Sequence, residues 1–163
     1  MKTIYFIRHA KSDWSVKCDD FDRGLNERGQ KDAPFMAKRL KKHNIKPDII
    51  ISSPAKRTLA TANIIAETLD VTNLVTKSEL YESDAAEYLN VIQNIDDKYE
   101  SIFIVGHNPA ITYICESLSG VYIGNIPTCG IFCIEFDTDF FTQISAIQGK
   151  KLFFDFSKKH RGL

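Results

Sequence analysis

An α/β fold, with a mainly parallel central sheet and helices on both of its faces, is the fold class that this sequence predicts. Two observations lead to it. Short apolar runs alternate with amphipathic segments along most of the chain, which is typical of strands joined by helical crossovers. The apolar runs are also continuous, with no polar residue at every second position. Continuous runs fit strands that are buried on both faces.

The first half of the chain contains the clearest elements. Asn26 is a good N-cap for a helix, and apolar residues recur on one face of the segment that follows it. Solid β-branched or apolar runs flank this segment and the next amphipathic one. We therefore expect strands over residues 3–7, 48–51 and 74–76 and helices over residues 26–43 and 55–69.

The second half of the chain begins with a helix marked by Tyr88, Ile92 and Ile95. A strand over residues 101–105 and a helix over about 109–118 follow, and Pro109 suits a first helical turn. The remaining part is rich in β-forming residues, and we expect strands over 131–136, 141–147 and 151–156 that can pair antiparallel. No repeat or linker interrupts the pattern, so residues 1–163 are expected to form one domain.

The composition argues against several kinds of partner. The chain has 163 residues with 21 basic and 21 acidic side chains, so nothing global attracts nucleic acid or an anionic membrane. No apolar stretch approaches the roughly 20 residues of a membrane helix. The four cysteines form no Cys-x-x-Cys pair, so we expect reduced thiols, no metal site and a cytoplasmic location. The sequence leaves the oligomeric state open.

Three of the predicted strands are followed by cationic or reactive side chains. Arg8 and His9 follow the first, the segment 52–58 with Arg57 follows the second, and His107 follows the strand that ends near residue 105. Taken singly, each has a structural explanation: a satisfied polar side chain, a solvated charge or a turn. In a parallel sheet, however, the carboxyl ends of the strands meet at one edge, where ligands bind. Two arginines and two histidines would then surround one small space.

Those residue types together suit phosphoryl transfer. A guanidinium matches the oxygens of a phosphoryl group in a bidentate way and opposes the charge of the transition state. A neutral imidazole can attack phosphorus and form a bond that water later cleaves. Covalent capture divides one difficult hydrolysis into two easier steps.

The three motifs resemble the histidine phosphatase superfamily, which includes cofactor-dependent phosphoglycerate mutases and acid phosphatases. The motifs are Arg8-His9-Ala10, Ser52-Ser53-Pro54-Ala55-Lys56-Arg57-Thr58 and Gly106-His107-Asn108-Pro109. The short length, Ala10 and the segment over residues 22–29 are similar to the SixA-type phosphohistidine phosphatase branch. That branch usually has proline where this chain has Gly24.

The resemblance implies a three-layer α/β/α sandwich, phosphoglycerate mutase-like, without a large inserted cap. It implies His9 as the nucleophile, Arg8, Arg57 and His107 as the phosphate pocket, and neither a metal nor an organic cofactor. The expected function is hydrolysis of phosphohistidine or related phosphate substrates. The expected partner is a phosphorylated substrate, such as a phosphohistidine-bearing signalling domain.

Two further residues are candidates with alternatives left open. Sugar-phosphate enzymes of this family carry an acidic proton donor after the middle strand, and Glu82 is the candidate here, against a solvated loop glutamate. The SixA-type branch is thought to have no strong equivalent donor. Arg23 either lines the rim of the pocket or pairs with Asp22, and we favour the pair.

Other phosphatase chemistries fit poorly. Cys18 and Arg23 are one residue too close for a cysteine phosphatase loop, Asp137 and Asp139 lie in an acidic turn late in the chain, and no P-loop is present. The alternatives that remain are a general phosphomonoesterase or sugar-phosphate mutase of the same fold. A non-catalytic phosphopeptide-binding module is a further alternative.

Overall fold

The computed structural model describes residues 1–146 and 148–160, in which strands and helices alternate along most of the chain. None of the described helices is long and apolar enough to cross a membrane. The strands are β1 (Lys2–Arg8), β2 (Ile49–Ser52), β3 (Leu74–Thr76), β4 (Ser101–Gly106), β5 (Ile131–Phe136) and β6 (Lys150–Asp155). The α-helices are α1 (Glu27–Lys42), α2 (Lys56–Leu69), α3 (Ala85–Gln93) and α4 (Ala110–Ser119).

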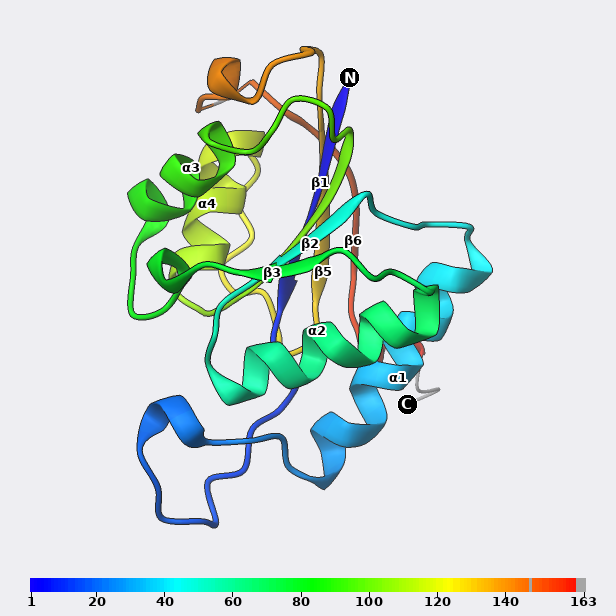
Figure 1. The fold of residues 1–163 in the computed structure, drawn as a ribbon, viewed down its shortest axis with the longest axis vertical. Helices are drawn as coiled ribbons and strands as arrows, with labels where there is room; N and C mark the ends of the chain where they lie inside the picture. Colours follow the sequence, from blue (N-terminus) through cyan, green and yellow to red (C-terminus); the bar gives the residue numbers. More distant parts are fainter. Residues whose placement is uncertain (147, 161–163) are drawn as a thin grey trace.

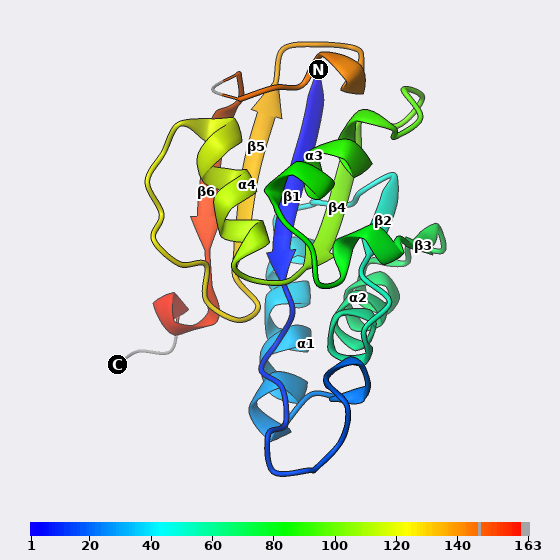
Figure 2. The ribbon, with the colours of Figure 1, turned by 90° about the vertical axis from the view of Figure 1, so that its left-hand side faces the viewer.

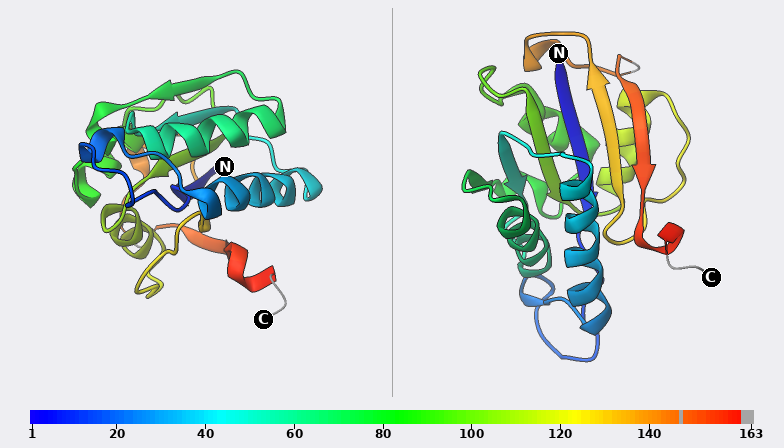
Figure 3. Two further views of the ribbon diagram at one scale, coloured as in Figure 1. Left: turned by 90° about the horizontal axis from the view of Figure 1, so that it is seen from below. Right: turned by 90° about the vertical axis from the view of Figure 1, so that its right-hand side faces the viewer.

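The strands form one sheet in the order β3-β2-β4-β1-β5-β6. The pairs β3–β2, β2–β4 and β4–β1 are parallel, whereas β5 and β6 are added antiparallel. Helices α1 and α2 cover one face of the sheet and α3 and α4 cover the other (Figure 1). Figure 2 shows α3 and α4 in front of the strands, and the right panel of Figure 3 shows α1 and α2 from the opposite side. The predicted α/β/α architecture is confirmed.

Two apolar clusters, one on each face of the sheet, explain why the central strands are continuously hydrophobic. Along β1, Ile4 and Phe6 pack with α3 and α4, whereas Ile7 packs with α1 and α2. Strands β2 and β4 divide their side chains between the two clusters in the same alternating way. This division follows from the two-residue period of a strand. Both faces of the central strands are therefore core.

Most element boundaries agree with the sequence prediction to within a few residues. Asn26 caps α1 as expected, because its side-chain oxygen accepts a hydrogen bond from Gly29 N at 2.8 Å. The predicted strand over residues 141–147 is wrong. Phe141–Gln143 is a short 3₁₀ helix that buries Phe141 and the nearby Ile144 three residues apart, and Ile147 lies outside the described residues. Their three-residue spacing suits a helical turn over the core rather than a strand.

A long loop, here called the arm (residues 13–24), separates β1 from α1. Its base is closed by an antiparallel bridge between Ser12 and Leu25 and by a hydrogen bond from Asp13 N to Gly24 O of 2.8 Å. It contains the short 3₁₀ helix Asp20–Asp22. The arm projects beyond the carboxyl end of β1 and is the blue loop at the bottom of Figure 1.

Candidate active site

The carboxyl ends of β1, β2 and β4 lie together because these strands are parallel neighbours in the sheet. The backbone N–H of His9, just after β1, donates to Gly106 O at 3.1 Å. The N–H of Ser53, just after β2, donates to Val105 O at 3.0 Å. His107 follows β4 directly. The three motifs therefore begin at one edge of the sheet, as the sequence predicted.

A pocket of about 350 Å³ opens at this edge. Arg8, His9, Arg57 and His107 all line it, and so does Arg23. A larger hollow of about 420 Å³ beside β6 contains none of these residues. The other residues that line the pocket are Lys11, Ser12, Trp14, Asn108 and Thr128. The pocket is thus rich in hydrogen-bond donors and positive charge, which suits an anion.

His9 is held as a neutral imidazole with one nitrogen free. The side chain is only 7% exposed. Burial is the main cause that lowers the pKa of His9 to about 4, and the charges of Arg57 and Arg8 lower it further, against a hydrogen bond to Ala10. His9 Nδ1 lies 2.7 Å from Ala10 O. A carbonyl only accepts, so Nδ1 carries the proton and Nε2 keeps its lone pair.

His107 presents a proton donor. Its Nε2 lies 2.8 Å from Ser53 Oγ, which also accepts from Ala55 N at 3.3 Å. In the described structure the only partner that can take the Ser53 hydroxyl proton is His107 Nε2, so Nδ1 carries the ring proton. This Nδ1 is buried and has no hydrogen-bond partner among the described residues. Burial first, and then His9 and Arg57, lower the pKa of His107 to about 3, so the ring is neutral.

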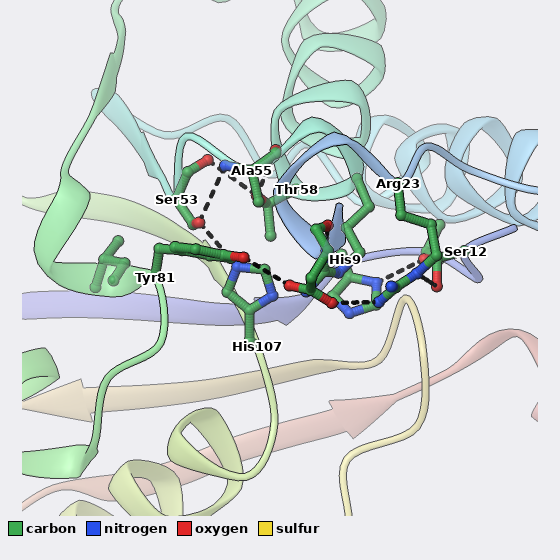
Figure 4. A network of polar contacts seen from close by, with 12 residues as sticks. His9, Ser12, Arg23, Ser53, Ala55, Thr58, Tyr81 and His107 are labelled. Atoms are coloured by element: carbon green, nitrogen blue, oxygen red, sulfur yellow. Dashed lines mark hydrogen bonds and ion pairs between the residues drawn. The ribbon is translucent and has the colours of Figure 1, made fainter. Parts of the chain in front are cut away.

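The two imidazoles lie side by side, with ring centroids 5.4 Å apart (Figure 4). The backbone of His107 is fixed by Tyr88, whose hydroxyl accepts from His107 N at 3.0 Å and donates to Leu80 O at 3.2 Å. Glycine is required at position 106, because a Cβ atom there would lie 2.2 Å from the Tyr88 hydroxyl. The turn that carries His107 is therefore built on a close approach that only glycine permits.

Two arginines bring unused donors to the pocket. Arg8 donates from Nη1 to Ile126 O at 2.9 Å. Arg57, in the first turn of α2, donates from Nη1 and Nη2 to Asp20. The Nε atoms of Arg8 and Arg57 are both buried without a partner in the described part of the chain. Buried donors are rarely left unpaired. Together with His107 Nδ1 they leave three buried donors unpaired on side chains that line the pocket.

Arg23 lines the pocket, and the favoured pairing with Asp22 is wrong. Its Nη2 lies 2.8 Å from Asp20 Oδ1, and its Nε donates to Ser12 Oγ at 3.2 Å. Its guanidinium lies 3.6 Å from the ring centroid of Trp14. Asp20 is three residues before Arg23, across the 3₁₀ helix, where side chains eclipse. The adjacent Asp22 cannot reach the same position.

Glu82, the candidate proton donor, is not brought to the pocket in this structure, and its role stays a prediction. Glu82 is exposed and is not among the residues that line the cavity. Its backbone has a φ of 49°, in the left-handed region. Tyr81 takes the inward direction instead: its ring stands edge-on to His107 at 5.6 Å, and its hydroxyl donates to Asp20 Oδ2 at 2.7 Å (Figure 4).

Sequence reasoning missed Asp20, Tyr81, Ser12 and Trp14. The first two come from the arm and from the segment after β3, and neither carries a periodic pattern. Tyr81 stands beside Glu82 in the segment that the sequence indicates, and it is the tyrosine that contacts His107 and Asp20. The only available signal for Asp20 was its spacing of three residues from Arg23.

The two histidines predict a loss of stability in acid. An unfolded histidine titrates near a pKa of about 6.5, whereas His9 and His107 titrate near 4 and 3 in the folded protein. Below pH 6.5 the unfolded chain therefore binds more protons, so stability is full above pH 6.5 and falls as the pH drops toward 4. The two residues together should cost on the order of 4 kcal/mol between pH 6.5 and 4.5.

Urea unfolding at pH 7.5, 6.5, 5.5 and 4.5 measures this loss. The double variant His9→Gln, His107→Gln should flatten the profile, whereas His43→Gln, at an exposed helix end, should leave it unchanged. A wild-type profile that is flat down to pH 4.5 would mean that the two imidazoles are not held neutral.

No group of three or more His, Cys, Asp or Glu side chains in residues 1–146 and 148–160 has the arrangement of a metal site. The site that the geometry does offer is a neutral imidazole with a free nitrogen beside several positive or donating groups. Such an arrangement can bind a tetrahedral oxyanion and attack its central atom.

Comparisons with known proteins agree with this geometry. The family model for the histidine phosphatase superfamily (branch 1) matches residues 4–91. Phosphoserine phosphatase 1 of Hydrogenobacter thermophilus is 31% identical over 107 residues, which are 63% of this chain and 49% of that protein. The chain spans about half the length of that relative. A 2,3-bisphosphoglycerate-dependent phosphoglycerate mutase of Mycobacterium leprae is 31% identical over 71 residues. Those residues are 42% of this chain and 29% of that protein.

Solved structures extend the likeness to nearly the whole chain. A protein assigned as the phosphohistidine phosphatase SixA from Agrobacterium tumefaciens has a TM-score of 0.84 and 26% identity, covering 96% of this chain and 98% of that one. A protein histidine phosphatase SixA in complex with tungstate has a TM-score of 0.82 and 18% identity, covering 94% and 96%. The second likeness shows a shared fold.

Proposed function

The chain belongs to the histidine phosphatase superfamily, branch 1, and on that premise we propose that it is a phosphatase that uses His9 as a covalent nucleophile. The observation that carries the proposal is the state of His9. Its proton is held on Nδ1 by Ala10 O, and its unprotonated Nε2 belongs to a ring that lines a pocket with three arginines. A neutral imidazole beside anion-binding groups is the arrangement that nucleophilic attack on phosphorus requires.

The reaction follows in two steps. Arg8, Arg57 and His107 Nδ1 hold the phosphoryl oxygens while the lone pair of His9 Nε2 attacks phosphorus. The bond from phosphorus to the leaving group breaks, and the leaving group takes that electron pair and a proton from water. A second water then attacks phosphorus, the N–P bond breaks and its electron pair returns to Nε2. Inorganic phosphate and a proton are released.

The substrate that suits this pocket has a good leaving group. No described residue that lines the pocket carries a carboxyl group, and Glu82 is exposed outside that lining. An enzyme-bound acid is therefore not at hand to protonate an alkoxide. The ring of a phosphohistidine can instead take a proton from solvent on its other nitrogen. It then leaves phosphorus as neutral imidazole, which is a much weaker base because its conjugate acid has a pKa near 6.5. A phosphohistidine on a protein surface is thus the favoured substrate class, and the likeness to SixA at 26% identity supports it.

Two other assignments belong to this proposal. The partner is a phosphorylated protein, such as a signalling domain that carries phosphohistidine. The location is the cytoplasm, which is supported by the four cysteines because none of them forms a disulfide. Hydrolysis or transfer on small phosphate esters is the second candidate, and it is favoured by the sequence similarity to a phosphoserine phosphatase and to phosphoglycerate mutases.

A substrate series tests the proposal. We expect the protein to hydrolyse a phosphohistidine-bearing domain and p-nitrophenyl phosphate, and to hydrolyse phosphoserine and 3-phosphoglycerate more slowly by roughly 10²- to 10⁴-fold in kcat/KM. That range is what a positioned general acid contributes. The measurement is phosphate release under identical conditions for all four substrates.

The variant Glu82→Gln tests whether Glu82 acts as a general acid that protonates the leaving group. We expect it to change neither the aryl nor the alkyl rates. The opposite result has two parts: alkyl esters react as fast as the aryl ester in wild type, and only the alkyl rates fall in Glu82→Gln. That result would identify Glu82 as the proton donor and favour an enzyme that acts on small phosphate esters. Tight binding of phosphate without turnover of any substrate would favour a non-catalytic binding module.

A further inference from the structure

The arm is fastened to the rest of the protein by one aspartate. In the described structure, every hydrogen bond and ion pair that joins residues 14–22 to residues outside the arm is made by Asp20. Its Oδ2 accepts from Arg57 Nη2 at 3.0 Å and from the Tyr81 hydroxyl at 2.7 Å. Its backbone oxygen accepts from Arg57 Nη1 at 2.7 Å. Apart from these bonds, the ring of Phe21 packs on Tyr81 at 5.2 Å.

The same carboxylate joins two of the pocket arginines. Asp20 Oδ1 pairs with Arg23 Nη2 at 2.8 Å while Oδ2 binds Arg57. Partial burial alone would raise the pKa of Asp20, but the hydrogen bonds from Tyr81, Arg57 and Arg23 lower it to about 2. The group is therefore ionised at any working pH. Charge-assisted bonds of this kind are short and fix the direction of a guanidinium.

Asp20 contacts both arginines without lining the cavity itself. It is not among the residues that line the pocket, whereas Arg23 and Arg57 are. Arg57 gives only its Nη atoms to Asp20, and its Nε remains buried without a partner in the described residues. A guanidinium has five N–H donors. Asp20 therefore uses only part of the donor capacity of Arg57.

We propose that Asp20 is a positioning residue, which aims Arg57 and Arg23 at the phosphoryl group and holds the arm over the pocket. This inference rests on the proposed function, since it assigns a partner to the phosphate-binding side chains. Asp20 does not contact the substrate and moves no proton. Its effect passes through the two guanidiniums, and it also holds Trp14 in place because the Trp14 ring is stacked on Arg23.

The opposite role for the same carboxylate makes the opposite prediction. If Asp20 were an internal competitor that occupies the arginines in place of phosphate, its removal would free them and add net positive charge to the pocket. Anions would then bind more tightly. A positioning residue predicts weaker binding, because the guanidiniums lose their orientation although the pocket becomes more positive. The sign of the change therefore separates the two roles.

The test compares Asp20→Asn with Asp22→Asn. Both residues are exposed and belong to the same short helix, but Asp22 makes no side-chain hydrogen bond or ion pair in the described structure. We expect Asp20→Asn to weaken vanadate binding and to lower kcat/KM for p-nitrophenyl phosphate, each by about tenfold or more, as loss of a charge-assisted partner does. We expect Asp22→Asn to match wild type in both.

A second readout separates positioning from a structural role. The asparagine keeps the size of the side chain and an oxygen for Tyr81, so the melting temperature should change little. Trp14 is the sole tryptophan of the chain, and its fluorescence anisotropy reports how firmly the arm is held. We expect anisotropy to fall in Asp20→Ala, which removes both carboxylate oxygens, and to fall less in Asp20→Asn.

The outcomes are distinguishable. Unchanged or tighter vanadate binding in Asp20→Asn overturns the positioning role while leaving the phosphatase intact. Equal losses in Asp20→Asn and Asp22→Asn would mean a general charge effect and would overturn it as well. A wild-type protein that binds vanadate but turns over no phosphate substrate overturns the proposed function instead, and the effect of Asp20 on vanadate affinity would still be measured.

Discussion

His9→Ala is expected to abolish turnover, with a loss in kcat on the order of 10⁴- to 10⁶-fold, as removal of a covalent nucleophile does in other enzymes. The reason is chemical, because no other described residue that lines the pocket offers an unprotonated imidazole nitrogen free to attack phosphorus. His107 is committed through Nε2 to Ser53 and presents its proton on Nδ1. The residual rate is measured as phosphate release over hours. Wild-type enzyme, diluted until its rate of phosphate release is equally low, serves as the reference.

The same variant reports on the intermediate. A rapid acid-free denaturing quench with ³²P-labelled substrate should leave label on the wild-type chain and none on His9→Ala. Binding of inorganic phosphate should survive, because Arg8, Arg57 and His107 do not depend on the His9 ring for their positions. His43→Ala is the matched control. Turnover or chain labelling that persists at wild-type level in His9→Ala would eliminate the covalent mechanism.

The meeting of the three motifs could be predicted from the sequence because it depends on local patterns and one topological rule. The strands that precede Arg8, Ser53 and His107 are short, continuous and buried, and each ends at its reactive segment. If such strands are parallel and adjacent, their ends must lie together. The order β2-β4-β1 then brings the segments within reach of one ligand.

The outer part of the site could not be predicted, because it depends on long-range contacts of an irregular loop. Asp20 reaches Arg57 across 37 residues and Tyr81 across 61. Nothing in the sequence around the arm indicates which of its acidic residues faces inward. Tyr81 contacts His107 and Asp20, whereas the next residue, Glu82, is exposed and has a positive φ. A non-glycine residue in that conformation is uncommon enough that sequence alone does not suggest it.

Arg57→Ala is expected to weaken vanadate and phosphate binding and to lower kcat/KM by roughly 10²- to 10³-fold, since a guanidinium that opposes transition-state charge in a dry pocket contributes several kcal/mol. The side chain is only 6% exposed, so water screens it little. Arg57→Lys should recover only part of the loss, because an ammonium is a point charge without the planar fork. The control Arg39→Ala removes an equal charge beside β6 and should leave anion affinity unchanged. If anion affinity is also unchanged in Arg57→Ala, Arg57 lies outside the phosphate site.

Arg57 is also the main partner of Asp20, so the two substitutions are expected not to add. In the Arg57→Ala background, Asp20→Asn should weaken vanadate binding by less than it does in wild type, because the carboxylate then has only Arg23 left to orient. The loss in the double variant is then smaller than the sum of the two single losses, which is expected when one residue acts through another. Two residues that contribute independently would give equal losses in both backgrounds, and Asp20 would then affect the anion directly rather than through the guanidinium.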